Sequence, residues 1–264
     1  YKRQGSGRGV DLNNDVIAAS GTVSMTGQHN TGATYALSLS GSTSVTAGTG
    51  VTLESLNNNT GTIALLSSGG INGGSGTVLM RAANYAFGGA DRTITTTGVL
   101  TIQPDADENS FASSFDNQYL NPVSVTGLTL GKSSNASAIT LSRAISLSGP
   151  VSIYGGSIDV NANITANSGN ILLDADTGST LNQSSTGILL DDAITIETVT
   201  SGNLTLIGRS GDTGSGFDGI DASSANTTTL RSAGNLTLQG YSYAASGSGR
   251  GVDLNNDVIA ASGT

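Results

Sequence analysis

The residues best suited to chemistry in this chain are carboxylates that stand close together in short polar segments. The sequence DADTG places Asp174 and Asp176 two residues apart, and a glycine two positions later allows a sharp bend. A second group, Asp105, Asp107 and Glu108, lies in the segment QPDADENS. Carboxylate oxygens are hard ligands of the kind that Ca²⁺ prefers. These five acidic residues are therefore the candidates for a calcium site.

Other acidic residues follow apolar strands or glycine-rich segments, namely Asp191, Asp192, Asp212, Asp218 and Asp221. Two known calcium motifs do not fit the sequence. The nonapeptide of calcium-binding β-rolls requires Gly-Gly-x-Gly-x-Asp, and the nearest segment, GGSGTVL, has Thr77 where the aspartate is needed. No segment matches the twelve-residue loop of an EF hand. We expect solvated carboxylates and no cofactor, with calcium as the alternative.

Catalysis has few suitable groups in this sequence. His29 is the only histidine and cysteine is absent, so an activated nucleophile or a zinc site has almost no bases or ligands to draw on. A glycoside hydrolase needs two acids that face each other across a groove, and aromatic platforms for sugars are scarce because tryptophan is absent. We expect His29 to be a polar turn residue and the protein not to be an enzyme. A β-helical polysaccharide depolymerase is the catalytic alternative.

Threonine-rich segments raise the possibility of an ice-binding face. RTITTTGV begins at Arg92 and NTTTLRS begins at Asn226. An ice-binding face needs threonine at the same place on successive coils, whereas the outward positions here mix Ser, Thr, Asn, Asp and Arg. Ordinary β-branched strand residues are the favoured explanation, and an ice-binding β-helix is a further alternative.

Charge and hydropathy exclude two classes of partner. Ten Lys and Arg stand against nineteen Asp and Glu, which gives a net charge of −9. Because a phosphate backbone is repelled by this charge, we expect no nucleic-acid partner. No run of about eighteen apolar residues is present, so we expect no membrane insertion.

The apolar residues that must position any site recur in very short strands. Between Ala144 and Asp176, strands begin every six or seven residues, and each alternates apolar with small polar residues. Pairs such as Ile145 with Leu147 and Val151 with Ile153 point to one side. Three such strands fill about 19–20 residues, which is one triangular turn of a parallel β-helix. The sequence therefore predicts an all-β parallel β-helical solenoid with three short strands per coil.

One segment departs from this rhythm. Residues 103–122, QPDADENSFASSFDNQYLNP, combine four acidic residues with three aromatic ones. We expect a loop excursion whose aromatic side chains pack back onto the coils. The whole chain, 1–264, is then a single solenoid segment.

A long internal repeat is the most specific feature of the chain. GSGRGVDLNNDVIAASGT occupies residues 5–22 and returns unchanged at 247–264, a shift of 242 residues. In this segment we expect Val10, Leu12, Val16 and Ala18 to face inward. The repeat indicates a tandem unit whose length equals this shift, and a chain that forms part of a longer array.

The repeat style resembles that of filamentous-haemagglutinin-like giant exoproteins and adhesins of Gram-negative bacteria. The resemblance rests on the segment from Gly127 to Asp176 and on GNLTLQGYSYAASGSGRGVDLNNDVIAASGT from Gly234 onward. It implies a right-handed parallel β-helical shaft that is exported by two-partner secretion to the cell surface or the medium.

The resemblance also implies a function. We expect a non-catalytic structural module of an extracellular filament or adhesin shaft, which supports cell attachment or fibre formation. Its partners would be adjacent repeats, end to end, and a glycan or protein on a host or neighbouring cell. The alternative is a glycan- or protein-binding module that acts through residues 103–122.

Overall fold

The computed structural model describes residues 9–29, 35–56, 61–66, 69–89, 91–105, 108–122, 124–175, 185–191, 193–212, 215–222, 227–255 and 257–262. The regular secondary structure in these ranges is entirely β-strand. No helix in the described residues is long and apolar enough to cross a membrane. The chain divides into two compact units, Tyr1–Gly131 and Lys132–Thr264. The expectation of one uninterrupted segment stays a prediction.

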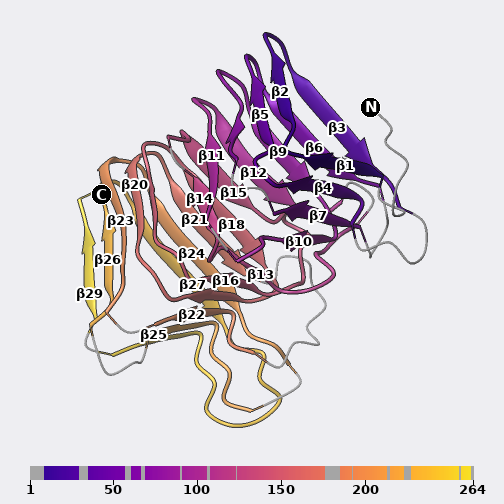
Figure 1. Cartoon of the computed structure of the whole chain (residues 1–264). Coiled ribbons are helices and arrows are strands. Elements are labelled where there is room, and N and C mark those ends of the chain that lie inside the picture. Colours follow the sequence, from indigo (N-terminus) through magenta and orange to yellow (C-terminus); the bar gives the residue numbers. More distant parts are fainter. Residues whose placement is uncertain are drawn as a thin grey trace. The chain divides into compact units, whose positions relative to one another are not determined.

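The first unit contains three parallel sheets that receive successive strands in rotation (Figure 1). The first sheet consists of β1 (Val10–Asn13), β4 (Leu37–Ser40), β7 (Thr62–Leu65) and β10 (Asn84–Ala86). The second consists of β2 (Val16–Ala19), β5 (Ser44–Ala47), β8 (Ile71–Asn72), β11 (Arg92–Thr95) and β14 (Leu120–Pro122). The strands of this unit in the third sheet are β3 (Val23–Gly27), β6 (Val51–Ser55), β9 (Val78–Arg81), β12 (Val99–Gln103) and β15 (Gly127–Leu130).

The second unit follows the same rotation. Its first sheet contains β16 (Ile139–Leu141), β19 (Ile158–Val160), β22 (Ile188–Leu190), β25 (Ile220–Ala222) and β28 (Val252–Leu254). Its second sheet contains β17 (Ile145–Leu147), β20 (Ile164–Ser168), β23 (Thr195–Ser201), β26 (Thr229–Ser232) and β29 (Val258–Ala261). Its third sheet contains β18 (Val151–Gly155), β21 (Ile171–Ala175), β24 (Leu204–Arg209) and β27 (Leu236–Tyr241).

This pairing confirms the predicted parallel β-helix with three strands per coil. The expected coil length holds only where β16–β18 pair with β19–β21, as in the pair Val151 and Ile171. Other coils are longer, and Ile171 pairs with Leu204 while Val23 pairs with Val51. The additional residues lie in the connections between strands, so the strand register is kept while the coil length varies.

Each unit is held together by ladders of aliphatic side chains. In the first unit, Val51, Val78 and Leu100 follow one another in register and are fully or almost fully buried. In the second unit, Ile153 and Leu173 do the same. Complete burial of such a side chain stabilises the fold by about 1.5–3 kcal/mol. Because both sides of an inner coil are covered by other coils, the ladders stabilise a stack rather than a single turn.

Glycines at the ends of third-sheet strands let the chain turn closely against the next coil. A Cβ atom added at Gly208 would lie 2.0 Å from the carbonyl oxygen of Gly219, and one at Gly240 would lie 1.7 Å from that of Gly251. No side chain fits at these distances. The glycines are therefore needed for close approach of two backbones.

Residues 103–122 are not wholly a loop, in contrast to the sequence-based expectation. Residues 106 and 107 lie outside the described ranges, but β13 (Phe115–Asp116) and β14 are strands. Leu120 of β14 pairs with Arg92 of β11, so the segment re-enters the second sheet of its unit. The aromatic side chains Phe111 and Phe115 are buried, as expected.

The inward face of β2 was predicted incorrectly. Val16 is 75% exposed and Ala18 is exposed as well, whereas Ile17 pairs with the fully buried Val45. The preceding corner contains Asn14 in the left-handed region, with φ 60°. A difference of one residue in where a strand begins after such a corner reverses both of its faces.

Candidate functional site

Among the described residues, three aspartates of the second unit lie close enough together to hold a metal ion. One side-chain oxygen from each of Asp218, Asp221 and Asp253 lies within 4.8 Å of the others. Asp221 of β25 and Asp253 of β28 are register partners, and Asp218 precedes β25. The parallel ladder thus aligns carboxylates that are far apart in sequence.

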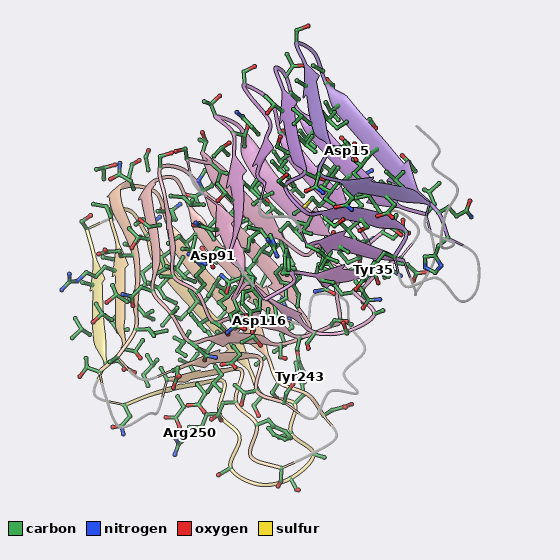
Figure 2. All side chains as sticks on the ribbon, viewed as in Figure 1. Asp15, Tyr35, Asp91, Asp116, Tyr243 and Arg250 are labelled. Carbon is green, nitrogen blue, oxygen red and sulfur yellow. The ribbon has the colours of Figure 1, made fainter. Side chains whose placement is uncertain are left out.

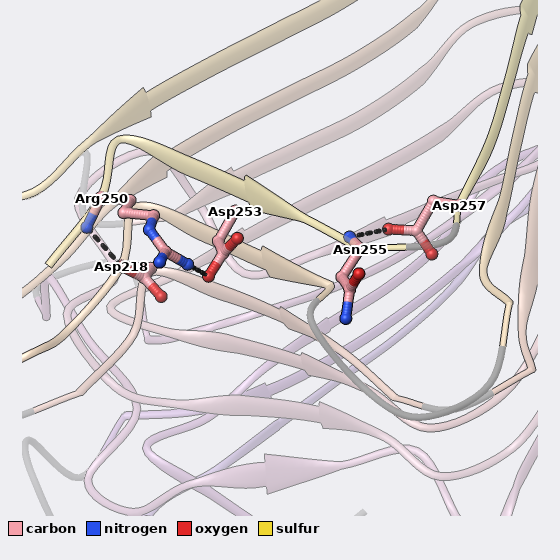
Figure 3. A network of polar contacts seen from close by, with 5 residues as sticks. All are labelled: Asp218, Arg250, Asp253, Asn255 and Asp257. Carbon is pink, nitrogen blue, oxygen red and sulfur yellow. Dashed lines mark hydrogen bonds and ion pairs between the residues drawn. The ribbon is translucent and has the colours of Figure 1, made fainter. Parts of the chain in front are cut away.

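An arginine connects two members of this carboxylate cluster (Figure 3). The main-chain N–H of Arg250 donates to Oδ1 of Asp218, and its guanidinium donates to Oδ2 of Asp253. Burial raises the pKa of the Asp218 carboxyl, and the charges of Asp221 and Asp253 raise it further, whereas the hydrogen bond from Arg250 lowers it. The repulsion within the cluster is therefore only partly neutralised by Arg250.

Three hard oxygen ligands suit a divalent cation such as Ca²⁺. The same carboxylates are also ordinary surface groups when they bind an arginine, and Arg250 already occupies part of their hydrogen-bonding capacity. What the arrangement offers chemically is concentrated negative charge, which can bind a cation or respond to pH.

None of the five calcium candidates predicted from sequence belongs to this cluster. Asp174 lies in β21 and forms an ion pair with Arg209 at 2.9 Å. Burial raises the pKa of the Asp174 carboxyl, although Arg209 acts in the opposite direction. Asp105 is buried, and its carbonyl accepts a hydrogen bond from the N–H of Glu108 at 3.1 Å. Asp107 and Asp176 lie outside the described residues.

Asp253 was missed by the sequence analysis, although Asp218 and Asp221 were considered. Its proximity to Asp221 depends on a coil much longer than the expected one, since Ile220 pairs with Val252. The assumption of a fixed, short coil hides this alignment. The signal that would have revealed it is the similarity between GIDA at Gly219 and GVDL at Gly251.

A second candidate site in the first unit is an aromatic cluster around residues 103–122. The ring of Tyr85 lies edge-on to those of Phe111 and Phe115, with centroids 5.9 and 5.7 Å away. Phe111 and Phe115 stack on each other at 5.5 Å, and Phe87 contacts Phe115 at 6.1 Å. Such contacts between aromatic rings add to the stability that burial of the rings provides.

Beside these rings lies a cavity of about 210 Å³. Its lining combines aromatic residues with polar ones: Ala83, Asn84, Tyr85, Phe87, Phe111, Ser113, Ser114, Phe115, Asp116, Gln118 and Tyr119. The Tyr85 hydroxyl donates to the carbonyl of Gln103 at 2.9 Å, and burial raises its pKa well above the ordinary value, so it stays neutral. Asp116, labelled in Figure 2, and Gln118 are exposed. The cavity therefore offers both apolar contact and hydrogen bonds to a small ligand.

The described part of the repeated eighteen-residue segment supplies two of the three strands of a coil in each unit. Among the described residues, β1 and β2 pair only with β4 and β5, which follow them in sequence. The identical β28 and β29 pair only with β25 and β26, which precede them. One sequence is thus seen with a neighbouring coil on either of its two sides.

Comparison with protein-family models, with curated proteins and with solved structures finds no match to this chain. The resemblance to filamentous-haemagglutinin-like exoproteins therefore stays a prediction based on the style of the repeats.

Proposed function

We propose that this chain is a non-catalytic structural module of a long extracellular β-helical filament or adhesin shaft. The observation that supports the proposal is the repeated segment. In the described part of the chain, one copy pairs with the coil that follows it and the other with the coil that precedes it, so this sequence accepts a neighbouring coil on either side. A module of this kind works by adding coils, each of which buries the aliphatic ladder of the next. Its partners would be adjacent repeats.

The proposal places the chain outside the cell or on its surface. The absence of cysteine is compatible with export, since no thiol can mispair in an oxidising environment. Immunogold labelling of the source cells with antibodies to this chain tests the location and the assembly together. Label along filaments on intact cells supports the proposal, and label that requires permeabilised cells contradicts it.

The non-catalytic part of the proposal has its own test. The chain is incubated with acidic and neutral polysaccharides, and new reducing ends are measured over time. Sustained release of reducing ends would favour the depolymerase alternative. A release rate equal to that of heat-denatured protein supports the structural function.

A second candidate function is the binding of a glycan or protein through residues 103–122, and the cavity beside the aromatic cluster favours it. Tyr119 and Gln118 line this cavity, and neither side chain is buried in the core as Phe111 and Phe115 are. Deleting the segment would also remove the buried Phe111 and Phe115, so that a loss of binding could not be separated from a loss of folding. Point variants therefore test the function more sharply.

The binding test compares the unmodified chain with Tyr119→Ala and Gln118→Ala on a glycan array and in a cell-adhesion assay. Tyr243→Ala is the matched control, since this tyrosine is exposed and lies in the other unit. Loss of adhesion in the Tyr119 and Gln118 variants alone supports a receptor site. Equal adhesion of all the proteins removes the cavity from consideration.

A further inference from the structure

The cavity beside the aromatic cluster lies where one ladder of strands in the first unit is interrupted. In the second and third sheets the ladder continues, because β11 pairs with β14 and β12 pairs with β15. In the first sheet, β10 is the last strand, and it pairs with β7. The next segment is joined to it by two bonds of 2.9 Å, from the N–H of Ala112 to the carbonyl of Ala83 and from the hydroxyl of Ser113 to Oδ1 of Asn84. The cavity thus belongs to a break in the ladder.

The aromatic rings that line the cavity stand in two directions. Tyr85 and Phe87 are almost parallel, with 11° between their planes, and Phe111 and Phe115 are inclined by 24°. Between these two pairs the planes are almost perpendicular, at 80° for Tyr85 with Phe111 and at 84° for Phe87 with Phe115. Tyr119 is a fifth aromatic residue of the lining. The cavity therefore has aromatic walls at right angles to one another.

A carboxylate is held beside these walls. Asp116 is an exposed residue of the lining (labelled in Figure 2), and its Oδ1 accepts a hydrogen bond from the N–H of Gln118 at 2.9 Å. The carbonyl of Tyr119 accepts from the N–H of Arg92 at 2.8 Å, which ties the same turn to β11. A carboxylate can accept about four hydrogen bonds, so the bond within the turn orients Asp116 and leaves capacity for a ligand.

The charge around the cavity favours a cation. Among the described residues that line it, none is lysine or arginine. Residues 82–131 contain one basic residue, the buried Arg92, against five acidic ones: Asp91, Asp105, Asp107, Glu108 and Asp116. Arg81, which precedes this range, forms an ion pair with Glu54 at 3.5 Å. Because the local charge is negative, an anionic ligand is repelled and a cationic one is attracted.

We infer that this cavity binds a methylated ammonium group, such as that of choline. Aromatic faces carry negative charge and attract a cation placed against them, and the carboxylate of Asp116 supplies the counter-charge. A primary ammonium is more strongly hydrated, so it loses more on leaving water than a methylated one. The inference rests on the second candidate function, binding through residues 103–122, and names the ligand class of that site.

Size and ring geometry distinguish this ligand from the alternatives. The cavity volume of about 210 Å³ is far larger than the share of about 30 Å³ that one water molecule has in the liquid, so the space suits an organic group. A neutral sugar stacks one flat face on a flat aromatic platform. Walls at right angles instead suit a tetrahedral group, which presents a methyl group in each direction.

Ligand-observed NMR with the unmodified chain tests the inference. Choline is compared with 3,3-dimethylbutan-1-ol, which has the same shape without the charge, and with glucose. Saturation transfer to the methyl protons reports the binding of the first two ligands, and titration gives the dissociation constants. We expect choline to bind about tenfold more tightly than its neutral analogue or more. Equal binding of the two, tighter binding of glucose, or no binding of choline would overturn the inference.

Two variants separate the contributions of charge and ring. Asp116→Asn keeps the acceptor for Gln118 but removes the charge, and choline should bind about threefold to tenfold more weakly while the neutral analogue is unaffected. Tyr119→Leu should weaken choline binding by about threefold to thirtyfold, and Tyr119→Phe should retain it. Tyr243→Leu in the other unit is the control, and thermal melts check that each variant is folded. An unchanged affinity for choline in both Asp116→Asn and Tyr119→Leu contradicts the assignment.

Two further measurements identify the source of the group and keep the proposals separate. Phosphocholine is titrated beside choline: weaker binding points to a free cation and equal binding points to a headgroup, and either supports the inference. Adhesion of the Tyr119 and Gln118 variants is scored independently. Choline binding without an effect on adhesion removes the receptor function but keeps the ligand class, whereas lost adhesion without choline binding does the reverse. Neither result bears on the filament labelling that tests the structural function.

Discussion

Replacing Leu173 with alanine should strongly destabilise the second unit. Leu173 is fully buried in β21, and its register partners are Ile153 on one side and Leu206 on the other. The change removes side-chain volume from the middle of a ladder rather than from its end. Neighbouring coils on both sides are therefore left with a cavity between them.

The size of this effect follows from the atoms removed. Leucine to alanine deletes three carbon groups, and each buried methylene contributes about 0.8 kcal/mol, which gives about 2.4 kcal/mol. The cavity adds about 24 cal/mol for each Å³ that the structure does not refill. We expect a total loss of about 3–5 kcal/mol in the free energy of opening.

Hydrogen exchange followed by mass spectrometry is the suitable assay, because a stack of coils can open locally. Protection should fall in β18, β21 and β24 and remain unchanged in β5 and β6 of the first unit. The matched control is Leu172→Ala, the same change on the outward, half-buried face of the same strand. Its loss should be about 1 kcal/mol or less.

The comparison of the two leucines decides whether the reasoning holds. Equal losses at Leu172 and Leu173 would mean that the inward and outward faces of β21 are not distinguished by burial. Loss of protection throughout the chain would mean that stability is not transmitted from coil to coil.

Three further outcomes are expected. Asp218→Asn should stabilise the second unit at neutral pH by about 0.5 kcal/mol or less because it removes repulsion between carboxylates near the surface. Since the folded pKa of Asp218 is raised, the contribution of this residue to stability falls as pH rises through that pKa, and thermal melts at several pH values should show a steeper fall in the unmodified chain than in the variant. Arg209→Gln should cost about 1–3 kcal/mol in urea unfolding by leaving Asp174 without its cation, and the loss should shrink at low pH. Gly208→Ala should cost about 1–3 kcal/mol by the same measurement because of its contact with a neighbouring carbonyl, whereas Gly21→Ala, with open space around it, should be almost neutral.

The fold was accessible from the sequence because its strongest signal is local. Ile145, Leu147, Val151 and Ile153 alternate with small residues, and all four are buried as predicted. Alternation over three or four residues needs no knowledge of distant partners. The reversed face of β2 shows the limit, since an apolar pattern alone does not specify at which residue a strand begins after a corner.

The candidate sites were less accessible because they depend on coil length. Asp221 and Asp253 meet only because the coil between them is far longer than the local strand rhythm indicates, and coils of this chain differ widely in length. The aromatic side chains of residues 103–122 were predicted to pack back onto the coils; Phe111 and Phe115 are buried, whereas Tyr119 is half-buried. The main aromatic partner of the two phenylalanines, Tyr85, lies outside the predicted segment, because β10 is a neighbour in space and not in sequence.

The constancy of register despite unequal coils has a consequence for variation among related sequences. The strands β18, β21 and β24 stay aligned although the interval from Val151 to Ile171 is much shorter than that from Ile171 to Leu204. Doubling the length of a flexible connection costs only about 0.6 kcal/mol in closure entropy. Insertions and deletions should therefore gather at the corners while the ladders are kept, so that a corner can accept a foreign peptide and display it without remaking the core.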